Sequence, residues 1–248
     1  MKLGTPEPER QDRTMAEVNI IAIGGGGVTN GTDPAMDIAL LNFCGLAAQR
    51  IGLVGTASGN DPGKIARFQA GFSELAAECR ILPIDADARQ ARAWAHGLDL
   101  IYIGGGDTLL LMRTLRQTRL HEALLAAAAE EGCVLAGVSA GAMCWFEAML
   151  TDTTGRLAPM AGLGILPGSC TAHARQDALR LPAFRDLIGR GLMPDGLALD
   201  DGVAVLCRRH APPRVLWARE GAAARIIRRE GQGVVETCLT EMNQNIAD

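Results

Sequence analysis

Short apolar runs ending in glycine alternate with segments of helical spacing over the first 140 residues, and this alternation is the strongest constraint on the fold. The run at 19–23 leads into Gly24–Gly27, and the run at 98–103 leads into Gly104–Gly106. Strands alternating with helices imply parallel strands joined by helical crossovers. Uninterrupted apolar strands are typical of a sheet covered by helices on both faces. The predicted fold is therefore α/β, a doubly wound and mostly parallel sheet flanked by helices.

The expected elements follow from this pattern. The predicted strands of the first half are 19–23, 51–54, 80–84, 98–103 and 133–136. The predicted helices are 35–48, 61–79, 88–95, 108–117, 121–131 and 140–149. After Pro167 the pattern becomes shorter and more strand-like. These added C-terminal strands, which finish the sheet or form an antiparallel edge, are 197–199, 203–207, 214–217, 224–227 and 234–238.

One domain accounts for this pattern, because no linker or internal repeat interrupts it. We expect a single α/β hydrolytic domain over 16–238, preceded by a disordered tail at 1–15 and followed by a loose tail at 239–248. The first 14 residues are polar and charged, which is unlike a signal peptide.

Composition excludes several classes of function. The net charge of −4, the 4% aromatic content and the absence of a basic block argue against nucleic-acid binding. No apolar run is long enough to cross a bilayer, so no membrane association is expected. The seven cysteines include no C-x-x-C pair and are odd in number, which favours a reducing compartment, and we expect a cytoplasmic protein.

Both glycine clusters follow strands, at the sheet edge where open α/β folds bind ligands. Glycine lets backbone N–H groups approach a ligand or an oxyanion closely. Gly24–Gly27 does not match a dinucleotide fingerprint, because Thr29 stands where the third glycine belongs. No Gly-Lys-Ser/Thr follows either, which excludes a Walker loop. Tight strand-to-helix turns are the alternative interpretation of this first cluster.

Ser139 lies between Gly137 and Gly141, directly after the apolar run at 133–136. This is either a simple tight turn or a nucleophile elbow, the G-x-S-x-G arrangement between a strand and a helix. In an elbow, the N–H of Ala140 is one oxyanion donor, and a neighbouring glycine loop supplies the second. Gly105 and Gly106 are the candidates for that second donor.

A nucleophilic serine needs a base, and the base needs a carboxylate partner. His96 and His121 lie in or beside predicted helices and His210 lies in a proline-containing turn, whereas His173 lies in a small-residue loop after a short strand. His173 is therefore the predicted general base. The preferred acid is Asp152, in the loop after the predicted helix that leaves the elbow. The alternatives are two other carboxylates near the serine in sequence, Glu147 and Asp177.

These motifs together resemble the peptidase E (aspartyl dipeptidase) and cyanophycinase family of serine peptidases. The matching stretches are Gly104–Thr108, Gly137–Ala142, Leu163–Gly168 with His173, and the acidic turn Asp200-Asp201-Gly202. The resemblance implies a fold like that of class I glutamine amidotransferases, related to flavodoxin-like sheets. It also implies hydrolysis of short peptides through an acyl-enzyme at a bond beside an acidic residue, with Ser139 as nucleophile and His173 as base.

Two positions depart from the family pattern. Asp107 stands where the family usually has asparagine, and a negative charge beside an oxyanion hole would disfavour the transition state. Its carboxylate either lies at the substrate site or points away and caps the helix beginning at Thr108. The residues around His173 also differ from the family's usual Cys-Pro-His-Tyr-Asp, and Arg175 among them is either an anchor for a substrate carboxylate or a surface charge.

The leading hypothesis is a cytoplasmic serine peptidase acting on short peptides, with no metal and no organic cofactor. One alternative is a tailoring enzyme that uses the same serine on one specific peptide. Another is a non-catalytic relative that binds a small acidic ligand. By analogy with other proteins of this fold class, a homodimer is expected.

Overall fold

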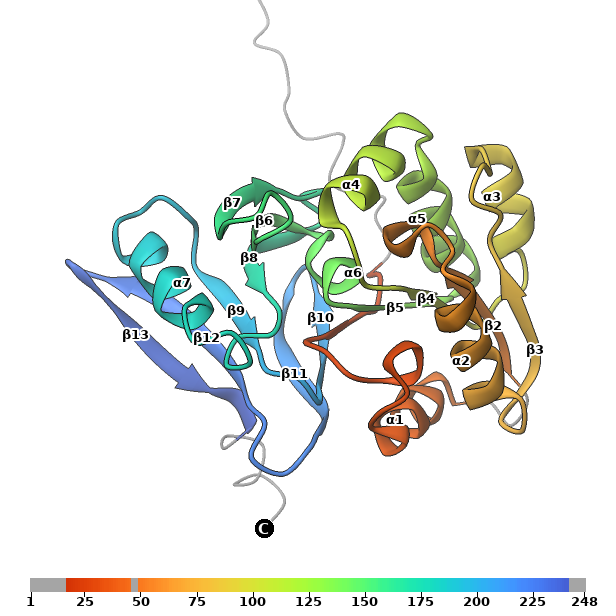
Figure 1. Cartoon of the computed structure of the whole chain (residues 1–248), viewed down its shortest axis with the longest axis horizontal. Coiled ribbons are helices and arrows are strands. Elements are labelled where there is room, and N and C mark those ends of the chain that lie inside the picture. The colour runs from red at the N-terminus through yellow and green to blue at the C-terminus, as the bar shows by residue number, and fades with distance from the viewer. Residues whose placement is uncertain (1–16, 46–48, 241–248) are drawn as a thin grey trace, which may run out of the picture.

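The computed structural model of the 248-residue chain describes residues 17–45 and 49–240. Within these residues, the strands form two β-sheets with helices packed against them (Figure 1). The predicted tail at 1–15 and residues 241–248 of the predicted tail at 239–248 lie outside the described residues. Leu239, which the prediction placed in the loose C-terminal tail, is buried against the core. The single domain over 16–238 stays a prediction.

The first sheet has the order β11-β10-β1-β5-β4-β2-β3. Its strands β1 to β5 are all parallel, and β10 and β11 extend it as an antiparallel edge. This confirms the predicted mostly parallel sheet with C-terminal strands added. The strands are β1 (Ile20–Ile23), β2 (Gln49–Val54), β3 (Ala76–Ile81), β4 (Leu100–Ile103), β5 (Val134–Val138), β10 (Val203–Arg208) and β11 (Ala211–Ala218).

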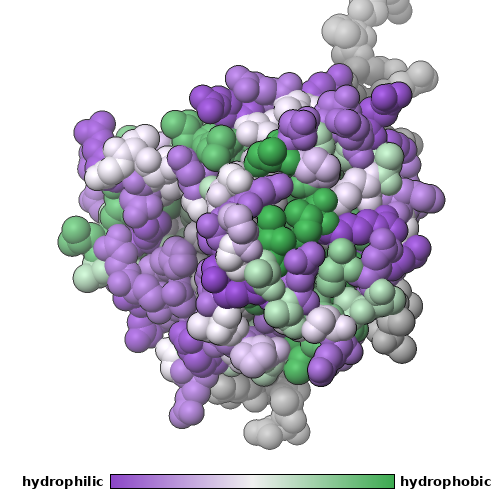
Figure 2. All heavy atoms as spheres, turned by 45° about the vertical axis from the view of Figure 1, so that its right-hand side comes forward, coloured by the Kyte–Doolittle hydropathy of each residue, from purple (hydrophilic) through white to green (hydrophobic). Residues whose placement is uncertain are grey.

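Helices cover both faces of this sheet. Buried side chains of α1 (Pro34–Cys44) and α2 (Pro62–Phe72) form a core with one face of β1, and the opposite face packs against α3 (Ala88–Ala95), α4 (Thr108–Gln117) and α5 (Leu120–Glu131). Proline occupies the first position of α1 and α2, where its missing N–H costs no hydrogen bond. Short 3-10 turns, η1 (Val28–Asn30) and η2 (Thr56–Ser58), follow β1 and β2. Figure 2, in which the right-hand side of Figure 1 comes forward, shows a mostly hydrophilic outer surface with a small group of apolar side chains near its centre.

The second sheet was not predicted as a separate unit. Its order is β13-β12-β9-β8-β6-β7, with parallel pairing only between β6, β8 and β9. One helix, α7 (Arg180–Gly189), packs on it through buried apolar side chains. This helix was not predicted, although its buried residues Leu181, Phe184 and Ile188 recur at helical spacing. The strands are β6 (Phe146–Thr151), β7 (Ala158–Ala161), β8 (Leu166–Thr171), β9 (Gly196–Leu199), β12 (Ala224–Glu230) and β13 (Gly233–Cys238).

The predicted helix over 140–149 is wrong beyond its first turn. The helix α6 (Ala140–Met143) ends after four residues, and the chain then forms β6. Alanine, methionine and glutamate favour a helix here, but pairing with β8 and burial of Trp145 and Phe146 outweigh that local preference. The carboxyl ends of the parallel strands lie level, since Ile23 pairs with Val138 and Ile103 pairs with Gly137. The residues that follow β1, β4 and β5 therefore meet at one edge.

Candidate active site

Ser139 begins the sharp turn from β5 into α6. Its backbone has φ 55° and ψ −114°, a strained conformation for a residue with a side chain. A Cβ on Gly137 would overlap the carbonyl oxygen of Gly141, and a Cβ on Gly141 would overlap that of Ile103. Both flanking glycines are therefore required by close backbone approach. A strained strand-to-helix turn with close-packed glycines on both sides is the arrangement that a nucleophile elbow requires, and the role of Ser139 as nucleophile stays a prediction.

His173 lies against the serine, as predicted. Its Nε2 is 3.0 Å from Oγ of Ser139, across 34 residues of sequence. The histidine lies just beyond the end of β8 with φ 55°, and its ring reaches Ser139, which follows β5 of the first sheet. Its side chain is 32% exposed, so the pair is accessible to a substrate.

Asp201, and not Asp152, is the carboxylate partner of this histidine. Oδ1 of Asp201 is 2.5 Å from Nδ1 of His173. A carboxylate at that position holds a proton on Nδ1 and leaves the Nε2 lone pair facing the serine hydroxyl. Asp201 follows β9, the parallel neighbour of β8, so the two side chains come from adjacent strand ends.

The three carboxylates considered from sequence are all engaged elsewhere. Asp152 forms an ion pair of 2.9 Å with the buried Arg180, which Asp177 also approaches at 3.6 Å. Glu147 lies in β6 rather than on a helix, and its carboxylate accepts a hydrogen bond from the amide of Gly168. The prediction of Asp152 is thus wrong in geometry: this residue follows β6, the other parallel neighbour of β8, but its carboxylate pairs with Arg180 and not with His173.

A usable signal for Asp201 was present in the acidic turn Asp200-Asp201-Gly202 after an apolar strand. The two aspartates of this turn have different surroundings. Asp200 is buried, with Arg225 at 3.0 Å and the amide of Ala223 at 3.0 Å, so it stabilises the second sheet. Asp201 is only partly buried, and its own amide donates to Oε1 of Gln176.

Gly24 and Gly25 join the two sheets at the site. The amide of His173 donates to the carbonyl of Gly24 at 3.3 Å, and that of Gly202 donates to the carbonyl of Gly25 at 2.9 Å. A Cβ on Gly25 would overlap Oδ1 of Asp201 and lie 2.8 Å from Cε1 of His173. Gly25 therefore lets the end of β1 approach the histidine–aspartate pair, while Gly26 and Gly27, with φ 85° and 77°, form the tight turn into η1.

The predicted oxyanion donors lie beside the serine. A Cβ on Gly105 would be 3.1 Å from Cβ of Ser139. Ala140 is the first residue of α6, where an N–H has no intrahelical acceptor. In the described part of the chain, the loop amides of Gly105 and Gly106 also donate to no backbone carbonyl. Gly105 and Ala140 thus lie against Ser139 with N–H groups that no backbone carbonyl of the described residues accepts, and Gly106 follows Gly105 in the same loop.

Asp107 points away from this site. Its carboxylate accepts hydrogen bonds from the amides of Leu109 and Leu110 and from Oγ1 of Thr153 at 2.7 Å. The Thr153 hydroxyl and these two amides hold the pKa of Asp107 below its usual range. The helix-cap alternative is therefore confirmed, and the prediction that Asp107 contacts substrate is not supported.

Arg175 is 55% exposed and lies 3.7 Å from a carboxylate oxygen of Asp200. This long ion pair leaves most of its guanidinium open to solvent. The substrate anchor predicted for this residue stays a prediction.

The other reactive groups offer no competing centre. Cys144, five residues past the serine, is fully buried, and burial raises the pKa of its thiol. No group of three or more His, Cys, Asp or Glu side chains is arranged for a metal ion among the residues described.

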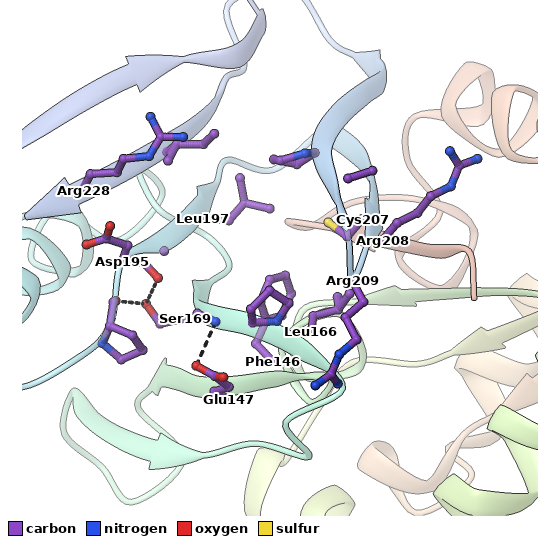
Figure 3. A pocket seen from close by; sticks show the side chains of 17 residues that line it. Phe146, Glu147, Leu166, Ser169, Asp195, Leu197, Cys207, Arg208, Arg209 and Arg228 are labelled. Atoms are coloured by element: carbon purple, nitrogen blue, oxygen red, sulfur yellow. Dashed lines mark hydrogen bonds between the residues drawn. The ribbon is translucent and has the colours of Figure 1, made fainter. Parts of the chain in front are cut away.

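A cavity of about 490 Å³ lies between β10 and the second sheet, lined by apolar side chains such as Phe146, Leu166 and Leu197 (Figure 3). Neither the serine nor its two partners line it.

Across 17–45 and 49–240, no helix has the length and apolarity to cross a bilayer.

The chain is similar in sequence to known peptidases. The model of peptidase family S51 matches residues 9–211. The uncharacterized peptidase YgaJ of Bacillus subtilis (strain 168) is 34% identical over 209 residues, which cover 83% of this chain and 90% of that protein.

Two solved structures share the fold. A peptidase from an acI-B1 Actinobacterium superimposes with a TM-score of 0.67 at 17% identity, over 91% of this chain and 98% of its own. A putative peptidase E protein from Listeria monocytogenes EGD-e gives 0.58 at 14% identity, over 90% and 100%. The resemblance inferred from the sequence motifs is confirmed, and the chain belongs to peptidase family S51, the peptidase E family.

Proposed function

We propose that this peptidase is of the serine type and hydrolyses short peptides, at a bond beside an acidic residue, through an acyl-enzyme on Ser139. The observation that carries the proposal is the continuous contact from the Ser139 hydroxyl through His173 to the carboxylate of Asp201. This is the geometry in which a histidine takes the proton of an attacking serine.

In the first half-reaction, Oγ of Ser139 bonds to the scissile carbonyl carbon and its proton passes to Nε2 of His173. The oxyanion accepts hydrogen bonds from Ala140 and from the glycine loop after β4. The C–N bond then breaks as His173 returns the proton to the leaving amine. Water attacks the acyl group in the second half-reaction, again losing its proton to His173, and the hydroxyl of Ser139 is restored.

One further observation supports catalysis over ligand binding alone. The carboxylate of Asp107, whose charge would oppose an oxyanion, is turned away into the cap of α4. The preference for an acidic residue rests on the family resemblance together with the exposed guanidinium of Arg175. All seven cysteines are free thiols, which supports a cytoplasmic location.

The test is a fluorophosphonate probe followed by a panel of dipeptides with and without acidic residues. We expect the probe to label wild-type protein at Ser139, and wild-type protein to cleave acidic dipeptides fastest. Ser139→Ala should neither label nor hydrolyse, while its thermal unfolding stays close to that of wild type. Hydrolysis by Ser139→Ala at the wild-type rate would refute the assignment.

A further inference from the structure

Lys64 contacts the active-site loop but has no part in the proposed reaction. Its Nζ donates a hydrogen bond of 2.7 Å to the carbonyl oxygen of Gly105. Lys64 is one of only two lysines, with Lys2, among the 24 lysine and arginine residues of the chain. In the described part of the chain, no carboxylate lies within ion-pair distance of it. The ammonium group therefore has the glycine carbonyl as its specific partner.

The topology places Lys64 beside the loop that it contacts. The strand β2 is the neighbour of β4 on the side opposite β5, and α2 follows β2. Lys64 lies in the first turn of α2, where its amide donates to the capping carboxylate of Asp61 at 2.8 Å. The helix thus supplies a fixed base from which the lysine side chain reaches the carbonyl of Gly105.

The hydrogen bond fixes the orientation of one peptide group. The carbonyl of Gly105 and the N–H of Gly106 belong to one planar trans peptide, so they point in opposite directions. Glycines on both sides of this peptide leave it free to rotate unless something holds it. With the carbonyl held by Lys64, the N–H of Gly106 points away from α2. Gly105 itself lies against Ser139.

We propose that Lys64 is a positioning residue that orients and polarises the Gly105–Gly106 peptide so that its N–H serves the oxyanion. Donation of an ammonium proton to the carbonyl strengthens the N–H on the same peptide as a donor. A donor fixed before the reaction begins needs no reorganisation when negative charge develops. This inference rests on the proposed serine mechanism and adds a residue that touches neither substrate nor the reacting atoms.

The test measures the maximal labelling rate and the half-saturating concentration of a fluorophosphonate probe. In labelling, phosphorus bonds to Oγ of Ser139, fluoride leaves and the hydroxyl proton passes to His173. The variants are Lys64→Met, which removes the bond, and Lys64→Arg, which keeps a cationic donor. Arg67→Met is the matched control, because Arg67 lies one turn along α2 and donates to a different carbonyl, that of Thr29, at 2.8 Å.

We expect Lys64→Met to lower the maximal labelling rate at least about tenfold without changing the half-saturating concentration, because the donor acts only as charge develops. Lys64→Arg should recover part of that rate, and Arg67→Met should label as wild type does. Thermal unfolding checks that each variant is folded, and Lys64→Gln, expected to be similarly slow, replaces Lys64→Met if the latter does not fold.

Two results overturn the inference in distinguishable ways. If Lys64→Met or its replacement labels at the wild-type rate while Ser139→Ala does not label, Lys64 has no positioning role and the serine mechanism stands. An equal loss in Lys64→Met and Arg67→Met likewise removes the specific role. If wild-type protein is not labelled at Ser139, the proposed function fails and this inference fails with it.

Discussion

Oδ1 of Asp201 lies 2.5 Å from Nδ1 of His173, although 28 residues separate the two in sequence. The contact exists because β8 and β9 are parallel neighbours, with Thr171 paired to Ala198, so the chain leaves both strands at the same edge. The serine comes from the first sheet and the other two groups from the second. The candidate site therefore lies where strand ends of the two sheets meet, and the distances between its three side chains depend on how the sheets pack together.

Replacing Asp201 by asparagine should lower the labelling rate of Ser139 by roughly 10³- to 10⁴-fold, because an amide favours the wrong histidine tautomer and cannot stabilise the imidazolium. Asp152→Asn is the control, since its carboxylate pairs with Arg180 and not with His173. It should label within about threefold of wild type. Equal losses of labelling rate in both variants would show that the carboxylate of Asp201 is not specifically required for the reactivity of Ser139.

Gly25→Ala should abolish labelling in a protein that still folds. The new methyl group would displace the carboxylate of Asp201 and press on the ring of His173. Circular dichroism measures whether the variant folds, and the labelling rate measures the reactivity of Ser139. Gly233→Ala is the control, because a Cβ there meets no atom closer than 4.0 Å. Normal labelling of Gly25→Ala would mean that the contact between the loop and the pair is not needed.

Asp37 should make the protein less stable as the pH rises. Burial raises the pKa of this carboxyl from 3.8 to about 7, partly opposed by the hydrogen bond from the amide of Val28, while the charge of Asp33 adds to the rise. Between those two values the folded state keeps a proton that the unfolded chain has released. The free energy of unfolding therefore falls through this window, by up to about 4 kcal/mol.

Asp37→Asn should remove this dependence while keeping an oxygen for the amide of Val28. Urea unfolding at about pH 5 and about pH 8 measures it, and the variant should gain stability relative to wild type at the higher pH. Asp85→Asn, at an exposed carboxylate, is the control and should leave the dependence unchanged. A parallel pH response in Asp37→Asn and wild type would contradict the prediction.

Asp107→Ala should lower stability and leave the serine reactive. Loss of the cap on α4 should cost about 1 to 2 kcal/mol of unfolding free energy, because two amides and the hydroxyl of Thr153 lose their acceptor. Asp107→Asn keeps an oxygen acceptor and should lose less. Urea unfolding measures the loss of stability, and probe labelling measures whether Ser139 stays reactive. A large drop in labelling by a stably folded Asp107→Ala would instead place this carboxylate in the reaction.

The features recognised from sequence are those fixed by local chemistry. The strained turn at Ser139 requires small residues on both sides, and this requirement is visible in the sequence as Gly137 and Gly141. The parallel strands of the first sheet are continuous apolar runs, since helices cover both faces. The cap at Asp107 precedes its helix directly, so the sequence showed it as one of two alternatives.

The features that the sequence did not reveal depend on contacts between distant segments. Residues 140–149 favour a helix locally, but β6 gains pairing with β7 and β8 and burial in the core. Asp152 is 13 positions past the serine and Asp201 is 62 past it, and each follows a parallel neighbour of β8, which is β6 for Asp152 and β9 for Asp201. Their side-chain partners separate them, since Asp152 pairs with Arg180 whereas Asp201 contacts His173.

The amino-acid sequence was therefore enough to predict Ser139 as nucleophile, His173 as its base and the parallel α/β frame, because each prediction depends on residue types within a short window. Only the tertiary structure decided that Asp201 completes the site, that Gly25 makes room for it and that Lys64 holds the glycine loop. Each of these is a contact between segments joined by long-range strand pairing, and pairing is set by the packing of the whole sheet rather than by any single strand.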